Sequence, residues 1–342
     1  MTAALARTSP VPGADQPHAP HPLHGADRNW PETNCYVDLW IELLHGRGLV
    51  PEAMLGFTLR QDFEGDQFTF FKPPAADLER LYGLEVLELA VYDGLETHAR
   101  ALAARGRPVL VEVDAIHLPD THGTTYGRDH GKTTIGILAL DPEARELDYL
   151  HNAGRFRLSG DDYRGIFGPA VLPPYAEFVK AIAKPLGPAD LPGAALDLLK
   201  RHRARAPERN PVVAFRDTLA ATAPALVTRP LAVFHAYAFN TTRQLGANFE
   251  LLASHLAWLD GTGLDGTGLD GTRLDGMGRG LFGPASEAAH RLGAEAKAFQ
   301  FQLARAFHRR SADGLTPRLD RLAATYADVF DALDRALDRV PG

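Results

Sequence analysis

The sequence predicts an α+β protein in which a helix packs on a mainly antiparallel sheet and an all-helical region follows. Three observations predict this class. An amphipathic helix comes first, at residues 35–45. Segments of strand-like alternation follow, between residues 84 and 152, and the periodicity after residue 175 is that of helices.

Changes in composition suggest the domain boundaries. Residues 1–29 are rich in Pro, Ala and His, lack the apolar run that a signal peptide needs, and are expected to form a disordered tail. A first domain is expected over residues 30–174 and a helical domain over residues 175–342. A five-residue repeat at 261–280 is too rich in glycine to pack, so it predicts a loop.

Charge and cysteine content exclude several classes of function. The net charge of −7 and the pI near 6.0 do not favour a nucleic-acid partner, which requires a concentrated basic surface. A single cysteine cannot form an internal disulfide, and this favours the cytoplasm. No segment has the apolar length of a membrane span, so no membrane partner is expected.

The helix predicted over residues 35–45 places the cysteine at its first position. Asp38 and Glu42 occupy one face, and Thr33 or Asn34 can cap the N-terminus. The other face carries apolar side chains at positions 36, 39, 40, 43 and 44.

The strands and the remaining helices follow from their periodicity. Two amphipathic helices are expected between residues 75 and 105, and they flank a strand at 84–89. An Asp-Pro turn predicts a hairpin between two of three further strands, which are expected at 109–114, 133–140 and 147–152. Helical periodicity then covers 175–184, 191–204, 211–223, 229–259, 285–310 and 315–338.

Cys35 is the first candidate for chemistry. A thiol at a helix N-terminus lies where backbone N–H groups and the helix dipole stabilise the thiolate, which is the form that attacks carbonyl carbon. The alternative is that Cys35 is an inert small hydrophobic residue, as lone cysteines often are.

A base and an orienting group follow Cys35 along the chain. His130 opens a predicted strand, and Asn152 or Asp148 stands at the end of the next strand. Such an order fits a nucleophile, a base and a group that fixes the imidazole tautomer. His117, His122 and His151 compete for the role of base, and His130 is preferred because it begins a strand.

Two further groups of residues leave alternatives open. Asp114, Asp120, His117, His122 and His130 offer oxygen and nitrogen ligands for a metal, although no metal-binding spacing occurs and no metal is expected. Asp66 and Gln67 either line a cleft beside the thiol, with Gln67 as an oxyanion donor, or form a turn. Substrate contacts are accordingly expected at Gln67, Asp66, Asp114, His117 and His122.

Long motifs identify the chain as a member of a bacterial family of unknown function. They are NCYVDLWIELLHG, DFEGDQFTFFKPP, VEVDAIHLPDT, HGKTTIGILALD and YLHNAG, and the resemblance extends from Asn34 to the C-terminus. More distantly, the first half resembles the N-terminal domain of the butirosin-biosynthesis acyltransferase, which implies a papain-like cysteine core. The resemblance maps the cysteine onto Cys35 and the base onto His130. An aspartate before proline in that relative is replaced here by Asn152 before Ala153.

The resemblance implies an acyltransferase that moves an aminoacyl group from a carrier-protein thioester, through Cys35, to an amine or a hydroxyl. Phosphopantetheine on an acyl or aminoacyl carrier protein would present the substrate, with no bound cofactor, and an amino acid–carrier protein ligase is a second implied partner. A cysteine peptidase or amidase, and a non-catalytic carrier-binding protein, are the competing functions. Binding an acidic carrier needs a basic patch, for which the candidates are Arg291, Lys297, Arg305, Arg309 and Arg310. These cations are otherwise a solvated helix face.

Overall fold

The computed structural model describes residues 18–168, 174–262 and 280–340. These residues divide into two compact units. The first unit contains residues 18–25, 34–51 and 74–186, and the second contains 26–33, 52–73 and 187–340. The sequence predicted a division near residue 174. In the structure the division lies near residue 186, and two earlier segments of the chain belong to the second unit.

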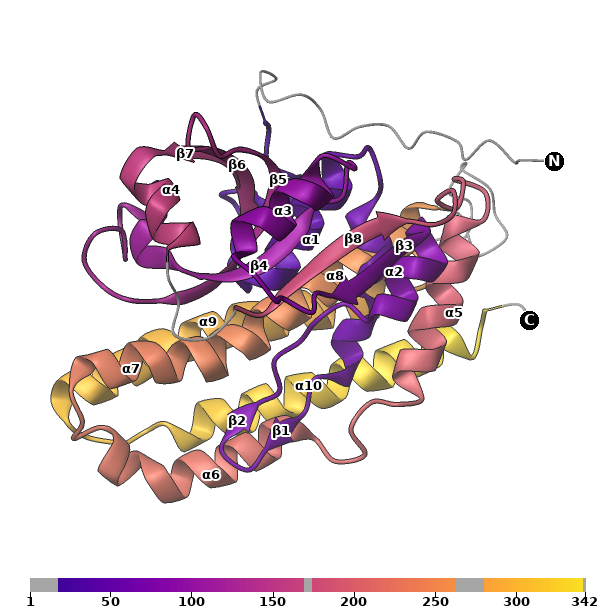
Figure 1. The fold of residues 1–342 in the computed structure, drawn as a ribbon. Coiled ribbons are helices and arrows are strands. Elements are labelled where there is room, and N and C mark those ends of the chain that lie inside the picture. Colours follow the sequence, from indigo (N-terminus) through magenta and orange to yellow (C-terminus); the bar gives the residue numbers. More distant parts are fainter. Residues whose placement is uncertain (1–17, 169–173, 263–279, 341–342) are drawn as a thin grey trace. The chain divides into compact units, whose positions relative to one another are not determined.

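The first unit is built on a six-stranded sheet in which every neighbouring pair of strands is antiparallel. This agrees with the α+β class and with the mainly antiparallel sheet expected from the sequence. The hairpin predicted from the Asp-Pro turn is also present, as β5 and β6. In spatial order the strands are β3 Leu84–Glu88, β8 Ala176–Ala181, β4 Val109–Asp114, β5 Lys132–Asp141, β6 Glu146–His151 and β7 Gly154–Ser159 (Figure 1).

Helix α1, Cys35–His45, covers one face of this sheet. Its Leu39 packs so closely on β5 that a Cβ atom at Gly136 would lie 2.6 Å from the Leu39 side chain. The opposite face carries a separate hydrophobic core, to which α3 Leu95–Ala103 and α4 Gly160–Phe167 contribute. Successive residues of β5 therefore serve two different environments.

Strand β8 corrects one prediction, because the sequence suggested a helix over residues 175–184. The segment instead fills the place between β3 and β4, where both of its edges are paired. Ala176 and Val179 are buried, and β-sheet hydrogen bonds to two strands far away in the sequence outweigh the local helical periodicity.

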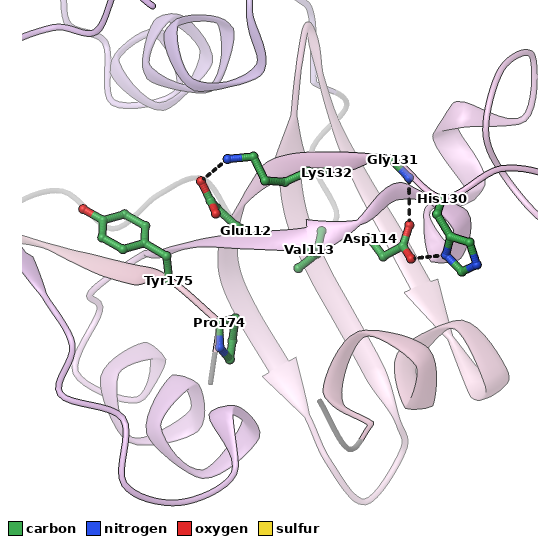
Figure 2. Close-up of a pocket in the computed structure, with 8 residues that line it drawn as sticks. All are labelled: Glu112, Val113, Asp114, His130, Gly131, Lys132, Pro174 and Tyr175. Atoms are coloured by element: carbon green, nitrogen blue, oxygen red, sulfur yellow. Dashed lines mark hydrogen bonds and ion pairs between the residues drawn. The ribbon is translucent and has the colours of Figure 1, made fainter. Parts of the chain in front are cut away.

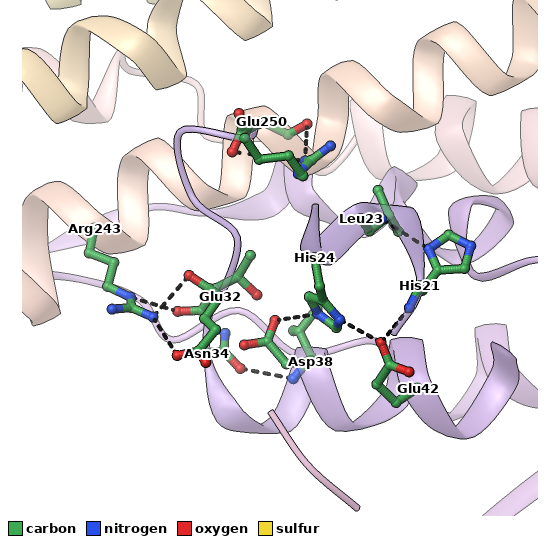
Figure 3. Close-up of polar contacts among 12 residues, drawn as sticks. His21, Leu23, His24, Glu32, Asn34, Asp38, Glu42, Arg243 and Glu250 are labelled. Carbon is green, nitrogen blue, oxygen red and sulfur yellow. Dashed lines mark hydrogen bonds and ion pairs between the residues drawn. The ribbon is translucent and has the colours of Figure 1, made fainter. Parts of the chain in front are cut away.

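The carboxylates of Asp38 and Glu42 on α1 are buried. Residues 18–24, which were expected to belong to the tail, lie over them. Glu42 accepts a hydrogen bond from His18 Nε2 at 2.6 Å. It also accepts from His24 Nδ1 at 2.5 Å, and Nε2 of His24 lies 3.4 Å from Asp38 (Figure 3).

This buried cluster stabilises charged forms of its members. Burial alone would lower the pKa of His24, but Asp38 and Glu42 outweigh it and raise that pKa to about 9. Burial would raise the pKa of Glu42, but hydrogen bonds from His18, His24 and the His21 backbone lower it to about 2. The segment is thus attached to α1 by an ionic contact.

The second unit is mainly helical, as predicted. Glu250 holds the segment 26–33 by accepting from the backbone N–H groups of Asn29 at 2.9 Å and Trp30 at 2.8 Å. The small hairpin of β1 Phe63–Glu64 and β2 Gln67–Phe68 packs on α6. The helices are α5 Leu191–Arg203, α6 Pro211–Leu226, α7 Leu231–Ala238, α8 Gln244–Gly261, α9 Gly283–Arg309 and α10 Thr316–Leu337.

One helix of this unit differs from the sequence prediction, and one predicted loop is not among the described residues. The helix predicted over residues 229–259 is divided by a π-helical turn, Phe239–Arg243, between α7 and α8. The glycine-rich loop predicted at 261–280 lies almost wholly outside the described residues. None of the helices described here combines the length and the apolar character that a membrane crossing requires.

Candidate active site

Cys35 is the first residue of α1, as the capping pattern predicted. The side chain of Asn34 is the N-cap and accepts from the N–H of Val37 at 2.9 Å. The thiol is partly exposed, and its Sγ lies 3.8 Å from Oγ1 of Thr134. Local sequence therefore places the thiol at the helix end, and the fold supplies a hydroxyl partner from the sheet.

Thr134 reaches the thiol because of the alternation of β5. Residues 134 and 136 point toward α1, as the contact between Gly136 and Leu39 shows. Cross-strand partners share a face, and Thr134 is paired with Glu112 while Lys132 is paired with Asp114. Glu112, Asp114 and Lys132 thus lie on the same face of the sheet as the contact between Cys35 and Thr134.

An open hollow of about 520 Å³ lies along this face, where β4 ends and β5 begins. Lys132 and Glu112 form an ion pair of 2.7 Å within it (Figure 2). Tyr175 forms one side, and its hydroxyl donates to Glu177 at 2.6 Å. The hollow is lined by Glu112, Val113, Asp114, His130, Gly131, Lys132, Pro174 and Tyr175.

His130 and Asp114 form a hydrogen-bonded pair in this hollow. Figure 2 shows their side chains directed toward each other, with Nδ1 of His130 2.5 Å from Oδ2 of Asp114. The other carboxylate oxygen accepts from the N–H groups of Gly131 at 3.0 Å and Ile116 at 3.2 Å. Asp114 is therefore held by its own backbone surroundings, and it fixes the imidazole.

The pair changes the proton affinity of both groups. The hydrogen bond and the charge of Asp114 raise the pKa of His130. The slight burial of Asp114 acts to raise its pKa, but His130 and the two backbone N–H groups outweigh burial and lower it. Because Nδ1 donates to Asp114, Nε2 is the nitrogen left to accept a proton from a reacting group.

The structure brings Cys35 and His130 to one face of the sheet but does not join them. In the part of the chain that is described, the thiol bonds to Thr134, the imidazole bonds to Asp114, and no hydrogen bond links the two side chains. Residues two apart on a strand are about 7 Å apart. Because His130 precedes Thr134 by four positions, its backbone lies well away from the contact between Thr134 and Cys35.

The chain matches two family models over most of its length. Residues 19–181 match the DUF1839 N-terminal domain, and residues 189–335 match the DUF1839 C-terminal domain. The chain belongs to the DUF1839 family. The function of this family is unknown, and no curated protein matches the sequence.

Asn152 and Asp148, the two candidates to orient the histidine, have other environments in the DUF1839 chain. Asn152 lies in the turn between β6 and β7 with φ of 45°, a backbone conformation that asparagine tolerates better than most residues. Asp148 is buried and forms two hydrogen bonds with Arg155, one of them at 2.9 Å. The carboxylate that bonds to His130 is Asp114, which was expected to contact substrate.

His151, which competed with His130 for the role of base, belongs to a buried network on the opposite face of the sheet. Its Nδ1 lies 2.5 Å from Asp120, and its Nε2 lies 2.8 Å from Oγ1 of Thr133. Tyr149 donates to the other oxygen of Asp120 at 2.6 Å. Both ring nitrogens are occupied, so this network fixes the start of β5.

Within the first unit, His117 and His122 do not line the hollow. His117 packs against Gly165 of α4, and His122 is exposed beside Tyr126. Asp66 and Gln67 belong to the second unit, where Asp66 lies in a two-residue turn and Gln67 begins β2. The turn that the sequence offered as one interpretation of these residues is present.

The alternative of a mixed metal site does not find support among the described residues. In those residues no group of three or more His, Cys, Asp and Glu side chains is arranged to hold a metal ion. The proposed ligands are divided, because Asp114 pairs with His130 and Asp120 pairs with His151.

Proposed function

We propose that this DUF1839 protein is a cysteine-dependent acyltransferase. It would accept an aminoacyl group from a carrier-protein thioester on Cys35 and pass it to an amine or a hydroxyl. One observation supports this most: the His130–Asp114 pair lines an open hollow on the face of the sheet that also carries a thiol at a helix N-terminus. Those are the parts that thiol-mediated acyl transfer needs.

The proposed chemistry begins when Nε2 of His130 takes the proton from the thiol of Cys35. The thiolate attacks the thioester carbonyl, the bond between that carbon and the pantetheine sulfur breaks, and the leaving thiolate takes the proton from His130. An acceptor amine or hydroxyl then attacks the acyl-enzyme and loses its proton to His130. Cys35 leaves as the thiolate.

Positioning and charge stabilisation come from named groups. Asp114 holds the tautomer with the proton on Nδ1, and the backbone N–H of Cys35 would donate to the oxyanion. The reaction requires Cys35 to leave Thr134 and His130 to approach it. Catalytic hydrogen bonds in unliganded enzymes are often incomplete. The side chain of His130 is 83% exposed, and it would have to approach the thiol together with Asp114, which holds it.

A papain-like core remains part of the proposal. A helix that starts with cysteine and packs on an antiparallel sheet supports it, as does the histidine beside the first residue of a strand. The third member departs from the pattern that the resemblance implies. Asp114 precedes His130 in the chain, whereas the resemblance places the orienting group after the histidine, at Asn152.

The test is intact-mass spectrometry of the protein mixed with an aminoacylated carrier protein. Wild type is expected to gain the mass of the aminoacyl group, and Cys35→Ala is expected to gain none. His130→Ala should acylate at least about 100-fold more slowly, while Asn152→Ala should match wild type. Acylation of Cys35→Ala to the same extent as wild type would refute the proposal.

The competing non-catalytic function has one observation in its favour, which is the hydrogen bond of Cys35 to Thr134 instead of His130. Under that function the carrier binds, no aminoacyl-enzyme forms, and Cys35→Ala behaves as wild type. A peptidase or amidase would share the thiol chemistry. It is distinguished by release of free acid from peptide or amide substrates without any acceptor.

A further inference from the structure

Acidic residues are missing from two stretches of the second unit. No Asp or Glu occurs between Asp217 and Glu250, or between Glu295 and Asp313, although the chain contains 43 acidic residues and has a net charge of −7. The cations in these stretches are Arg229, Arg243, Lys297, Arg305, Arg309 and Arg310. Positive charge is therefore concentrated locally in an acidic protein.

The two stretches pack against each other. The rings of Phe234 on α7 and Phe307 on α9 are 5.3 Å apart, and Thr242 donates to the side chain of Gln300 at 3.1 Å. The contact with Phe234 is made by Phe307, and the contact with the later residue Thr242 is made by the earlier residue Gln300. The two stretches therefore run in opposite directions. Residues at the start of α7 thus lie level with the end of α9.

An exposed strip of α9 carries both apolar and basic side chains. Phe301, Arg305 and Arg309 are spaced four apart, so they follow one face of the helix, and all three are exposed. Phe301 is 57% exposed, and Leu231 at the start of α7 is 58% exposed. We call these four residues, together with Arg229 and Arg310, the α7–α9 face.

The arginines of the α7–α9 face differ from others in the same unit. Within the described residues, Arg229, Arg305, Arg309 and Arg310 form no ion pair. In contrast, the following pairs join other arginines to α10: Arg203 with Asp334, Arg216 with Asp320, and Arg291 with Asp328.

The basic residues that the sequence suggested for carrier binding do not all have the same surroundings. Arg291 is paired, and Nζ of Lys297 lies 4.1 Å from the centre of the Trp30 ring, so both are engaged. The helix dipole accounts for basic residues in the last turn of α9. It does not account for Arg305 one turn earlier, for Arg229 on another element, or for the exposed Phe301.

We propose that the α7–α9 face docks an acidic protein whose carboxylates meet Arg305 and Arg309 and whose apolar side chains cover Phe301. Guanidinium groups that form no ion pair in the described part of the chain, set around exposed apolar residues, are complementary to such a surface. The identity of the partner rests on the proposed function, which makes it the acyl carrier protein. A nucleic acid would meet the same charges, but the aliphatic Leu231 and the acidic remainder of the chain favour a protein.

The test compares two charge reversals of equal size. Arg305→Glu with Arg309→Glu changes the face, and Arg321→Glu with Arg335→Glu changes exposed positions of α10 by the same net charge. Binding of a purified holo acyl carrier protein is measured by calorimetry. The first pair is expected to weaken binding by roughly tenfold or more, because attraction becomes repulsion, and the second pair should leave the Kd within about twofold.

A second variant and a second reaction keep this test separate from the proposed function. Phe301→Ser is expected to weaken carrier binding without changing the charge. Acylation of Cys35 by a small soluble thioester, which does not need docking, should be equal in wild type and in Arg305→Glu with Arg309→Glu. Loss of that acylation in all proteins would refute the acyltransferase and leave the docking surface standing.

Three outcomes would overturn the docking surface. The first is no carrier binding by wild type. The second is equal weakening by the two charge reversals, which would make the effect one of total charge. The third is tighter binding of a single-stranded oligonucleotide than of the carrier protein at the same salt concentration, which would make the face a nucleic-acid site.

Discussion

Asp114 and His130 are joined across the end of β4 and the approach to β5, with 2.5 Å between the carboxylate oxygen and the ring nitrogen. The other oxygen of the Asp114 carboxylate accepts from the backbone N–H groups of Ile116 and Gly131, so the position of the carboxylate does not depend on the histidine. This makes Asp114, and not Asn152, the residue that sets the proton affinity of the candidate base.

Asp114→Asn is therefore expected to lower the pKa of His130 toward its ordinary value of 6.5, because the negative charge that raises it is removed. The base must be neutral to accept a proton, so the pH at which Cys35 acylation rises should move to lower pH. NMR titration of His130 and the pH profile of acylation measure the two effects. Asn152→Ala is the control, and an equal shift in that variant would contradict the assignment.

Thr134 and Thr133 are neighbours with opposite surroundings, and this gives a matched pair of variants. Thr134→Val removes the hydroxyl that faces Cys35, so the thiol is expected to react faster with iodoacetamide while the fold is kept. Thr133→Val leaves the buried Nε2 of His151 without its partner, which costs about 1–3 kcal/mol in the free energy of unfolding.

Alkylation rates and urea denaturation of both variants check this pair. Thr133→Val should alkylate like wild type, since its side chain faces the other side of the sheet. If the two variants alkylate at the same rate, the contact between Cys35 and Thr134 does not control access to the thiol.

The sequence could predict the parts of this site that depend on local spacing. Helix α1 begins at Cys35 because Asn34 is an N-cap and the apolar residues recur at helical spacing, and both signals lie within a few residues. The end of β4 at Asp114 and the start of β5 near His130 could also be predicted, because strand-like alternation is a local signal.

The other parts depend on pairing between distant segments, which periodicity does not encode. The segment of β8 has helical periodicity, and this led to the prediction of a helix. Its strand conformation comes from pairing with β3 and β4, which are distant in the sequence. Asn152 was predicted to orient the histidine. The sequence did not reveal that this residue adopts a positive φ in a turn, because only its residue type indicates that conformation. The burial of Glu42 could not be read from α1 alone, since the covering histidines come from residues 18–24.

Gly136 is expected to be necessary for the approach of α1 to the sheet. In Gly136→Ala the new Cβ would lie 2.6 Å from the fully buried side chain of Leu39. Displacing that side chain should cost roughly 1–3 kcal/mol in the free energy of unfolding and move the thiol away from Thr134. Gly193→Ala in α5, where nothing lies within 4 Å, is the control and should be neutral or stabilising.

Denaturant unfolding and the alkylation rate of Cys35 measure the two consequences for Gly136→Ala. An unchanged midpoint in urea would show that Leu39 can move aside without loss of stability, and the close approach of α1 would then not require glycine.

His24 and Glu42 predict the pH range in which the first unit is most stable. The pKa of His24 is raised from 6.5 to about 9, so its contribution is complete below pH 6.5 and is lost as the pH rises through about 9. The pKa of Glu42 is lowered from 4.5 to about 2, so its contribution is complete above pH 4.5 and is lost as the pH falls toward about 2. Both contributions are complete only between pH 4.5 and 6.5.

His24→Gln should remove the alkaline part of this dependence and destabilise the protein by about 3–5 kcal/mol, because the buried carboxylates of Asp38 and Glu42 lose the cation that lies between them. His45→Gln, at the more accessible end of α1, is the control and should change stability by less than about 1 kcal/mol. Urea denaturation at a series of pH values measures both variants. If His24→Gln kept the alkaline loss of stability seen in wild type, another group would have to titrate there, and the contact between His24 and Glu42 would not be what secures residues 18–24 to α1.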